Sequence, residues 1–299
     1  AIREVDQNHI IYIEGNWYGT DFTNLTPPWD DNMSYSFHKY WGDVTVNTIQ
    51  SYLSMSSNFN IPLWLGETGE NSNHWYYEIV KLCEENNIGW NWWTHKKIEK
   101  TTSPFSAIVS PAYQNLLNYF NGSGSQPSAE YAQAALWEMA NSLKIENCIV
   151  NSGVIPSLTD PTFGITPRPF KPHSIPGIIA AVDYDIGANY VAYTDNEFMN
   201  TGPVGSNIGG ADGYYNIGWT YRNDGVDIEY NGDEGISYNV GWTDAGEWLG
   251  YTIEDVSPGL YDIKISVGGY DGYEVCQDLR TWEKLIKKDC KFFLIKEHL

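Results

Sequence analysis

The chain has 299 residues, enough for two domains of ordinary size. Its 38 acidic and 17 basic residues give a formal net charge of -21, which argues against a phosphate-binding surface and therefore against nucleic acid as a partner. No apolar stretch of the sequence is long enough to span a bilayer, so no membrane partner is expected. Aromatic residues make up 15% of the chain, a composition that suits surfaces on which flat rings stack against neutral ligands such as sugars.

The first 120 residues alternate short apolar runs with helical patterns. The runs predict strands buried on both faces at His9–Ile13, Met33–His38, Ile61–Gly66 and Ile88–Trp93. Helical spacing of apolar residues predicts helices at Val44–Ser57, Ser72–Asn86 and Pro111–Phe120. Strands and helices in this alternation predict parallel βα units, and four of them amount to about half of a (β/α)8 barrel of about 250 residues.

The composition and the predicted secondary structure change several times in the rest of the chain. A turn-rich break at 121–126 precedes a predicted helix over Ser128–Ile145, and six prolines between Pro156 and Pro176 predict an extended linker. Short runs separated by Asp-Gly and Asn-Gly turns then predict an antiparallel β-sandwich or jelly roll, with strands at Gly225–Glu229, Trp248–Ile253 and Leu260–Val267. The predicted domains are 1–165 (partial barrel with a helical extension), 166–174 (Pro-rich linker), 175–272 (β-sandwich) and 273–299 (divergent tail).

The tail, 273–299, contains no Gly and no Pro and holds six of the 17 basic residues. Its composition differs from that of the preceding segment. It is interpreted as foreign to that domain, with a native helical extension as the alternative. The four cysteines are widely spaced, with no CxxC pair that would indicate a metal or redox site.

Polar side chains follow the predicted strands, where the active sites of parallel barrels lie. They are Glu14, His38 with Tyr40, Glu67, and the group Trp93 to Lys96. A carboxylate can attack an anomeric carbon, His and Tyr can bind and orient that carboxylate, and a Trp can form the floor of a sugar subsite. This set therefore indicates a site that cleaves glycans.

The motifs at these strand ends resemble glycoside hydrolase family 5, in the right order and over roughly residues 1–120. They are Leu65-Gly66-Glu67, Phe37-His38-Lys39-Tyr40, Gly89-Trp90-Asn91-Trp92-Trp93, and Asp6-Gln7-Asn8-His9 followed by Ile10–Gly15. The resemblance implies an α/β fold that is the C-terminal half of a (β/α)8 TIM barrel. It implies a retaining endo-β-1,4-glucanase of the cellulase type.

The resemblance also implies roles for single residues. Glu67 takes the position of the nucleophile, Tyr40 would donate a hydrogen bond to it, and His38 would lie beside it. Trp93 would be the sugar platform, with Trp92 as the alternative. The plainer alternatives are a surface carboxylate for Glu67 and a core histidine for His38. Trp90 is interpreted as core and Glu14 as a structural or peripheral subsite residue.

The family's acid/base is the Glu of an Asn-Glu pair that closes the fourth barrel strand. No such pair follows an apolar strand within residues 1–120, and the chain is expected to begin after that strand. Retaining hydrolysis needs two carboxyl groups about 5 Å apart. We therefore expect little or no hydrolase activity from these 299 residues by themselves.

The segment from Ile175 to Gly272 resembles carbohydrate-binding module family 6. The resemblance rests on Ile175-Pro176-Gly177, on Tyr184-Asp185, and above all on the stretch from Arg222 to Tyr251. It implies that Trp242 lies at a loop-end cleft and Trp248 at a concave-face cleft, with core packing as the alternative for both. Val182 stands where the family has a calcium-binding Glu, so a structural calcium is in doubt; no metal is assigned and no other cofactor is expected. The late strands are replaced by the tail, so the isolated segment is expected to bind glucan or xylan weakly or not at all.

Three functions follow as alternatives. The first is a glycoside hydrolase with an attached binding module, acting on β-glucan or another plant cell-wall polysaccharide. The second is a non-catalytic carbohydrate-binding protein, and the third is a barrel enzyme acting on something other than a glycan. The resemblance implies an extracellular or periplasmic location, although no signal peptide is visible in the sequence.

Overall fold

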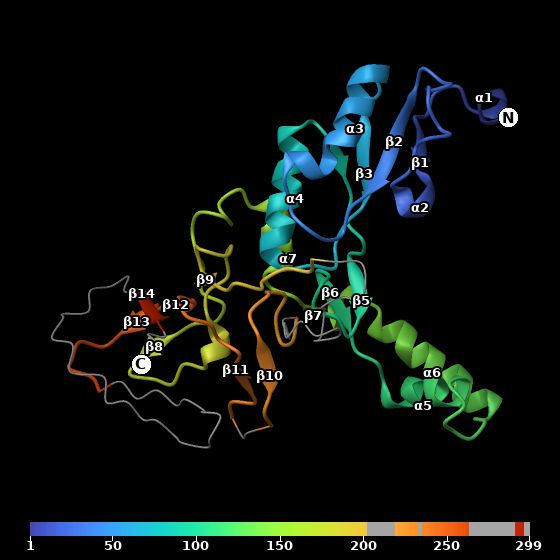
Figure 1. Ribbon diagram of the computed structural model, residues 1–299. Helices are drawn as coiled ribbons and strands as arrows, with labels where there is room; N and C mark the ends of the chain where they lie inside the picture. The colour runs from blue at the N-terminus through green and yellow to red at the C-terminus, as the bar shows by residue number, and fades with distance from the viewer. Residues whose placement is uncertain (202–218, 233–234, 263–290, 296–299) are drawn as a thin grey trace.

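The computed structural model describes residues 1–201, 219–232, 235–262 and 291–295. Its first part is a parallel sheet of four strands that lie in chain order (Figure 1). The strands are β1 (Ile11–Glu14), β2 (Met33–His38), β3 (Leu63–Glu67) and β4 (Gly89–Trp90). This sheet confirms the predicted parallel βα units.

One face of this sheet is covered by α3 (Val46–Phe59) and α4 (Asn73–Glu85). Odd-numbered residues of β2 and β3 share this face because side chains alternate along a strand. Tyr35, Phe37 and Leu65 are fully buried there against residues of the two helices, including Trp75 of α4. The Ser72 hydroxyl caps α4 by accepting a hydrogen bond from the Trp75 N–H. The helical periodicity of the sequence therefore located both helices and the face that each buries.

The prediction that every strand is buried on both faces is only partly right. Five consecutive residues of β2, from Met33 to Phe37, are buried. In β1, by contrast, Tyr12 is 50% exposed and the Glu14 side chain is 58% exposed. The reason is positional, since β1 lies at the edge of the described sheet and β2 has a neighbour on each side.

The predicted fourth strand, 88–93, is a strand over two residues only. Beyond Trp90 the chain stays beside β3 without a regular ladder. The Asn91 N–H donates to the Leu65 carbonyl at 3.1 Å and the Trp93 N–H to the Thr68 carbonyl at 2.9 Å. The residues after β4 are thereby held next to the end of β3.

A second sheet was not predicted. It joins β5 (Lys96–Ile98), β6 (Phe105–Ala107) and β7 (Ile149–Val150). Between β6 and β7 lie α5 (Pro111–Phe120) and α6 (Ala129–Ser142), which pack against each other (Figure 1), and a 3-10 helix, η1 (Ile145–Asn147). Both α-helices confirm the predicted helical segments.

The predicted extended linker is wrong where it begins. Residues Val154–Thr159 form α7, which packs against α4. Pro156 is the third residue of this helix, where the missing backbone N–H would have no partner within the helix in any case. Proline density therefore indicates a helix start here and not only an extended chain.

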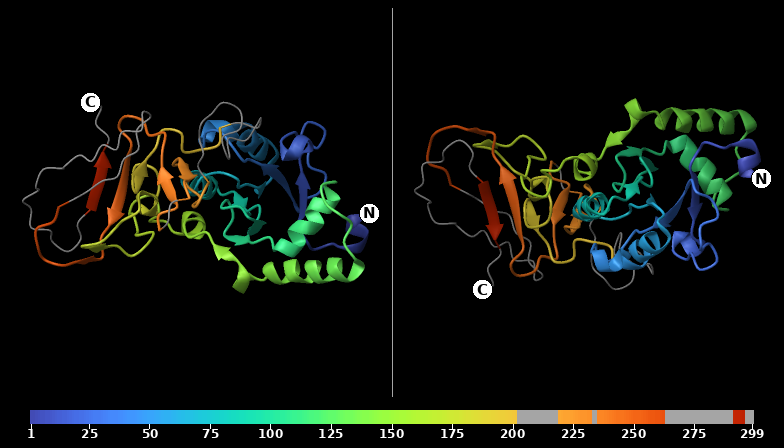
Figure 2. Two further views of the ribbon diagram at one scale, coloured as in Figure 1. Left: turned by 90° about the horizontal axis from the view of Figure 1, so that it is seen from below. Right: turned by 90° about the horizontal axis from the view of Figure 1, so that it is seen from above.

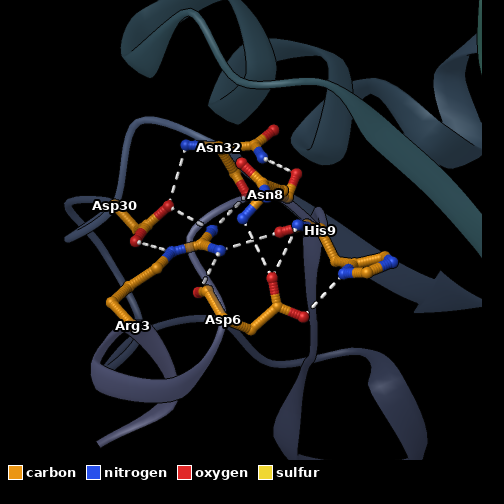
Figure 3. Close-up of polar contacts among 6 residues, drawn as sticks. All are labelled: Arg3, Asp6, Asn8, His9, Asp30 and Asn32. Atoms are coloured by element: carbon orange, nitrogen blue, oxygen red, sulfur yellow. Dashed lines mark hydrogen bonds and ion pairs between the residues drawn. The ribbon is translucent and has the colours of Figure 1, made fainter.

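The N-terminal helix, α1 (Ile2–Val5), is tied to the loop before β2 by one arginine (Figure 3). The Arg3 guanidinium donates to both carboxylate oxygens of Asp30 at 2.7 Å, and to the backbone carbonyls of Asn32 and His9. The hydrogen bonds from Arg3, and a further one from the Asn32 N–H, lower the pKa of Asp30 to about 2. The ends of the loops that flank β1 are thereby joined to each other.

The β-rich region, meaning the described residues from Ser174 onward, consists of short strands in three sheets. They are β8 (Ser174–Ile175), β9 (Tyr193–Thr194), β10 (Ile228–Tyr230), β11 (Tyr238–Val240), β12 (Trp248–Thr252), β13 (Asp255–Val256) and β14 (Lys291–Ile295), with a 3-10 helix, η2 (Ala181–Asp183). Figure 2 shows the orange and red strands of this region at the opposite end of the molecule from the blue strands β1 and β2. Its residues, Tyr184, Tyr193 and Ile228 among them, share one apolar core.

Two predicted strands of this region are found, at β10 and β12, and β12 is paired on both sides. Of the predicted strand at 260–267, residues 260–262 form no strand and 263–267 lie outside the described residues. Within the tail, β14 pairs antiparallel with β12, so this part is neither a helix nor separate from the preceding region. The β-sandwich as a whole stays a prediction.

Buried Asp195 gives the β-rich region a pH-dependent stability. Asp195 is 8% exposed, and burial, followed by the nearby Glu247 carboxylate, raises its pKa from 3.8 to about 8. Between these values the folded chain keeps a proton that the unfolded chain has released. The associated stability is therefore present below about pH 4 and is lost as the pH rises through 8.

We expect Asp195→Asn to remove this dependence while its Oδ1 still accepts from the Glu197 N–H. The difference in free energy of unfolding, variant minus wild type, should rise by about 2–5 kcal/mol from pH 4 to pH 8 in urea titrations. The comparison is made between the two chains because half-buried His74, whose pKa is lowered to about 4 by loss of solvation, titrates in the opposite sense. Parallel pH profiles would contradict the prediction.

Candidate active site at the carboxyl ends of the parallel strands

The ends of β2 and β3 bring three predicted residues together. The Tyr40 hydroxyl donates a hydrogen bond to Glu67 Oε2 at 2.7 Å. His38 Nδ1 lies 3.6 Å from the same oxygen. The side chains of Tyr40 and His38, 27 and 29 positions before Glu67, therefore meet at one oxygen of its carboxylate.

A β-bulge makes this convergence possible. Phe37 pairs with Leu65, but the next residue, His38, pairs with Glu67, so that Gly66 is the extra residue. In an unbroken ladder His38 would lie opposite Gly66, and Glu67 would be one residue too far along and on the other face. The bulge thus places the Glu67 carboxylate beside His38 and on the same face of the sheet.

Glu14, at the end of β1, contacts the opposite side of the same imidazole. His38 Nε2 lies 3.2 Å from Glu14 Oε1, and the His38 side chain is only 8% exposed. Gly19, with φ +76°, closes over this ring, since a Cβ at that position would lie 2.8 Å from two ring carbons. Because the imidazole stands between Glu14 and Glu67, the two carboxyl groups do not face each other directly.

These groups lie at a cavity of about 300 Å³. Two of the lining residues pack closely, since a Cβ at Gly66 would lie 2.0 Å from Ser36 Oγ. The cavity is lined by side chains from all four strands and their ends, namely Tyr12, Glu14, Ser36, His38, Trp64, Gly66, Glu67 and Asn91.

Four of these lining residues were not predicted: Tyr12, Ser36, Trp64 and Asn91. The first three are even-numbered, as are Glu14 and His38, and they occupy the face of β1, β2 and β3 away from the helices. Two-residue alternation between apolar odd and polar or aromatic even positions was the available signal. The ring of Tyr12 lies edge-on to that of Trp64 at 5.5 Å, and the Trp64 indole donates to Asn91 Oδ1 at 2.7 Å.

The tryptophans after β4 differ in their surroundings. Trp92 packs against the main core, with its ring 4.3 Å from that of buried Tyr76. Trp93 is 46% exposed, and its N–H is bonded to the Thr68 carbonyl one residue beyond Glu67. Trp90 also packs against the core, as interpreted from the sequence. Of the two alternatives, Trp93 is therefore the one with a ring surface available beside the end of β3.

The other predicted aromatic residues, Trp242 and Trp248, lie in the β-rich region, whose strands lie apart from the four-stranded sheet (Figures 1 and 2). Trp248 is partly buried and begins β12, where it pairs with Thr194 and Ile295. Trp242 follows β11 and is 53% exposed. The structure does not bring either of them to Glu67.

The doubt about a structural calcium can be tested on the residues themselves. Val182 is 3% exposed within the apolar core, and its side chain offers no oxygen ligand. Nor do the described parts of the chain hold any group of three or more His, Cys, Asp or Glu side chains placed to bind a metal ion. A structural calcium is therefore not assigned to the described residues.

The electrostatics of the site keep the tyrosine protonated. Burial, then the hydrogen bond and charge of Glu67, raise the pKa of Tyr40 well above its ordinary value. The phenol consequently remains a donor to the carboxylate throughout the range in which proteins are usually studied. Such an arrangement can hold a carboxylate in one orientation for attack.

Part of the chain is similar to a known protein family. Residues 1–98 match the model of the family Cellulase (glycosyl hydrolase family 5). The match includes β1 to β4 and the site residues His38, Tyr40, Glu67 and Trp93, and it confirms the expected resemblance over these residues. No curated protein matches the chain.

Several solved structures are also similar to parts of the chain. One described as an endoglucanase is 21% identical over 31% of this chain and 42% of that one, with a TM-score of 0.27. Thermotoga maritima Cel5A, solved with cellobiose, is 18% identical over 31% and 42%, with a TM-score of 0.28. The catalytic domain of Thermobifida fusca endoglucanase Cel5A is 18% identical over 48% of each chain, with a TM-score of 0.29. The chain thus spans less than half the length of these structures.

Within the described residues, no helix is both long and apolar enough to cross a membrane.

Proposed function

We propose that the first part of this chain carries the nucleophile side of a retaining β-glycanase site of the endo-β-1,4-glucanase type. The observation that carries the proposal is Glu67, held by Tyr40 and beside His38 at a cavity where parallel strands end. The match of residues 1–98 to a cellulase family supports a glycan as the substrate. The C-terminal half of a (β/α)8 barrel is the fold we propose for this part.

In the proposed step the Glu67 carboxylate attacks the anomeric carbon. A carbon–oxygen bond forms to Glu67 and the bond to the leaving-group oxygen breaks, giving a glycosyl ester that water later hydrolyses. Among the described residues, the polar contacts of Glu67 go to Oε2, so we assign the attack to Oε1. Trp93 would supply the sugar platform, since Trp92 is packed against Tyr76.

We further propose that these 299 residues, by themselves, cleave polymeric glycans weakly or not at all. The leaving-group oxygen of a polysaccharide must receive a proton from a second carboxyl group about 5 Å from the nucleophile. Glu14 does not meet this need because His38 stands between it and Glu67. Clear turnover of carboxymethyl-cellulose by the purified chain would contradict this part of the proposal.

An activated substrate tests the nucleophile without requiring a proton donor. A 2,4-dinitrophenyl 2-deoxy-2-fluoro-β-cellobioside has a leaving group that departs without protonation, and the fluorine slows breakdown of the ester. We expect the chain to gain the mass of one fluorocellobiosyl group, and peptide mapping to place it on Glu67. No labelling, or labelling of a different carboxylate, would refute the proposed function.

Tyr40→Phe is expected to lower the rate of this labelling by about tenfold, because the carboxylate loses the hydrogen bond that orients it. The rate is measured by intact-mass spectrometry over time. Tyr18→Phe is the matched control, since Tyr18 is 87% exposed and lies outside the cavity lining. Equal rates for Tyr40→Phe and wild type would show that the hydrogen bond does not orient the nucleophile.

The proposed partners are β-glucan or another plant cell-wall polysaccharide, which would be met outside the cell or in the periplasm. Nucleic acid and membranes are not proposed as partners, and no cofactor is proposed for the reaction. The formal net charge of -21 supports the exclusion of nucleic acid.

Glycan binding by the β-rich region is a second candidate function, supported by Trp242, which is 53% exposed. An exposed indole can stack on a pyranose ring. In affinity gels containing β-glucan or xylan we expect weak retardation of the full chain that Trp242→Ala removes. Strong retardation typical of an intact module would contradict the expected weak binding, and retardation unchanged by Trp242→Ala would exclude Trp242 as the contact.

A further inference from the structure

Asn71, between β3 and α4, makes a full set of hydrogen bonds that the proposed chemistry does not use. It is completely buried. Its amide nitrogen donates to the Tyr40 carbonyl at 3.0 Å and to the Asn200 carbonyl at 3.1 Å. Its oxygen accepts from the N–H groups of Ser72 at 2.9 Å and Asn200 at 3.0 Å. Two donors and two acceptor positions are all that a side-chain amide has.

These hydrogen bonds join Tyr40, whose hydroxyl donates to Glu67, to a distant part of the chain. Asn200 belongs to the β-rich region and lies 129 positions after Asn71. Its carbonyl also accepts a hydrogen bond from the Gly42 N–H at 3.1 Å. The segment from Tyr40 to Gly42 is therefore fastened at both ends to Asn200, once through Asn71 and once directly.

A neighbouring residue makes similar buried contacts without this link. The Asn73 amide nitrogen donates to Asp224 Oδ1 at 3.1 Å, and its oxygen accepts from the Asn223 amide at 2.9 Å. Asn73 is 1% exposed, and no hydrogen bond described for it reaches Tyr40 or Gly42. Asn71 and Asn73 thus both join the β-rich region to the start of α4, but only Asn71 is bonded to the Tyr40 segment.

We propose that Asn71 is a positioning residue through which the β-rich region holds Tyr40 against Glu67. The backbone of Tyr40 is fixed by the Asn71–Asn200 pair, and the phenol of the same residue donates to the carboxylate at 2.7 Å. The β-rich region then supports the site directly, whatever it binds on its own surface. The consequence for catalysis rests on the proposed function of Glu67, whereas the restraint on Tyr40 does not.

The restraint is tested by comparing Asn71→Ala with Asn73→Ala in the full chain. With 3-fluorotyrosine incorporated, the ¹⁹F resonance of Tyr40 is identified as the one missing from Tyr40→Phe. We expect Asn71→Ala to move or broaden that resonance and to speed amide hydrogen exchange at Gly42 about tenfold or more. Asn73→Ala should leave the resonance in place and change the exchange less than about twofold. Equal effects of the two variants, or no effect of Asn71→Ala, would overturn the proposal.

Labelling by the fluorocellobioside separates this inference from the function it rests on. If wild type is labelled at Glu67, Asn71→Ala should lower the rate about tenfold and Asn73→Ala should not. If wild type is not labelled, the proposed function fails, while the ¹⁹F and exchange results still decide whether Asn71 restrains Tyr40.

If either alanine variant fails to fold, the proposal is tested on the wild-type chain by comparing two of its N–H groups. Native-state hydrogen exchange then asks whether the N–H groups of Gly42 and Asn200 open together, as the shared bonds require. Equal opening free energies at the two N–H groups support the link. An opening equilibrium constant more than about tenfold larger at Gly42 than at Asn200 overturns it.

Discussion

Glu67→Gln is expected to abolish covalent labelling by the activated fluorocellobioside, lowering the rate by about 10⁴-fold or more. A carboxamide has nearly the shape of a carboxylate but lacks the charge and the nucleophilic oxygen. The Tyr40 hydroxyl can still donate to the amide oxygen, so the fold of the site should survive the change. Rates are measured by intact-mass spectrometry, and circular dichroism checks the fold.

Glu70→Gln is the matched control for this result. Glu70 lies three residues after Glu67, its side chain is 46% exposed, and it pairs with Lys97 and not with the site residues. Labelling should proceed in this variant at close to the wild-type rate. If Glu67→Gln is still labelled, at Glu14 for example, the carboxylate across the His38 ring is the nucleophile and the assignment of Glu67 is wrong.

Arg222→Ala is expected to lower the free energy of unfolding by about 3–5 kcal/mol. The Arg222 side chain is 4% exposed and donates to Asp224 Oδ2 at 2.6 Å. It also donates to the backbone carbonyls of Val182, Tyr184 and Asp185. Removing it leaves a buried carboxylate and three buried carbonyls without this donor, and it removes a guanidinium whose carbon lies 3.6 Å from the centroid of the Tyr184 ring.

Urea titrations followed by tryptophan fluorescence measure this loss. Arg168→Ala is the control, because Arg168 is half exposed and its ion pair with Asp160 lies at the surface; its loss should change stability by less than about 1 kcal/mol. Arg222→Lys should recover only part of the stability, since an ammonium cannot reproduce the planar fork of donors. A loss at Arg222→Ala no greater than at Arg168→Ala would show that the buried pair contributes little.

Much of the first 120 residues was predictable because the signals are local. Apolar runs and helical spacing located the strands β2 and β3 and the helices α3 to α5. The rule that sites form where parallel strands end placed Glu67, His38 and Tyr40 at one edge. One error farther along the chain is also local in origin, since Pro156 stands in the first turn of a helix, where proline is tolerated.

The exact pairing of the site residues depended on contacts between distant segments. Whether His38 lies opposite Gly66 or Glu67 depends on a bulge of one residue, and a shift of one residue reverses the face on which a side chain lies. The same holds for Glu14 on the far side of His38 and for Trp93 as the exposed member of its pair. Two-residue alternation indicates which side chains share a face, but it does not reveal a bulge of one residue.

The sequence by itself determined the parallel units, the candidate nucleophile Glu67 and the family that residues 1–98 match. Only the tertiary structure decided that Asn71 and Asn200, 129 positions apart, are hydrogen-bonded to each other and that Asn71 also donates to the carbonyl of Tyr40, whose hydroxyl donates to this carboxylate. The physical reason is that each strand or helix follows from its own residues, whereas a buried amide reveals its function only through the partners that the fold brings to it.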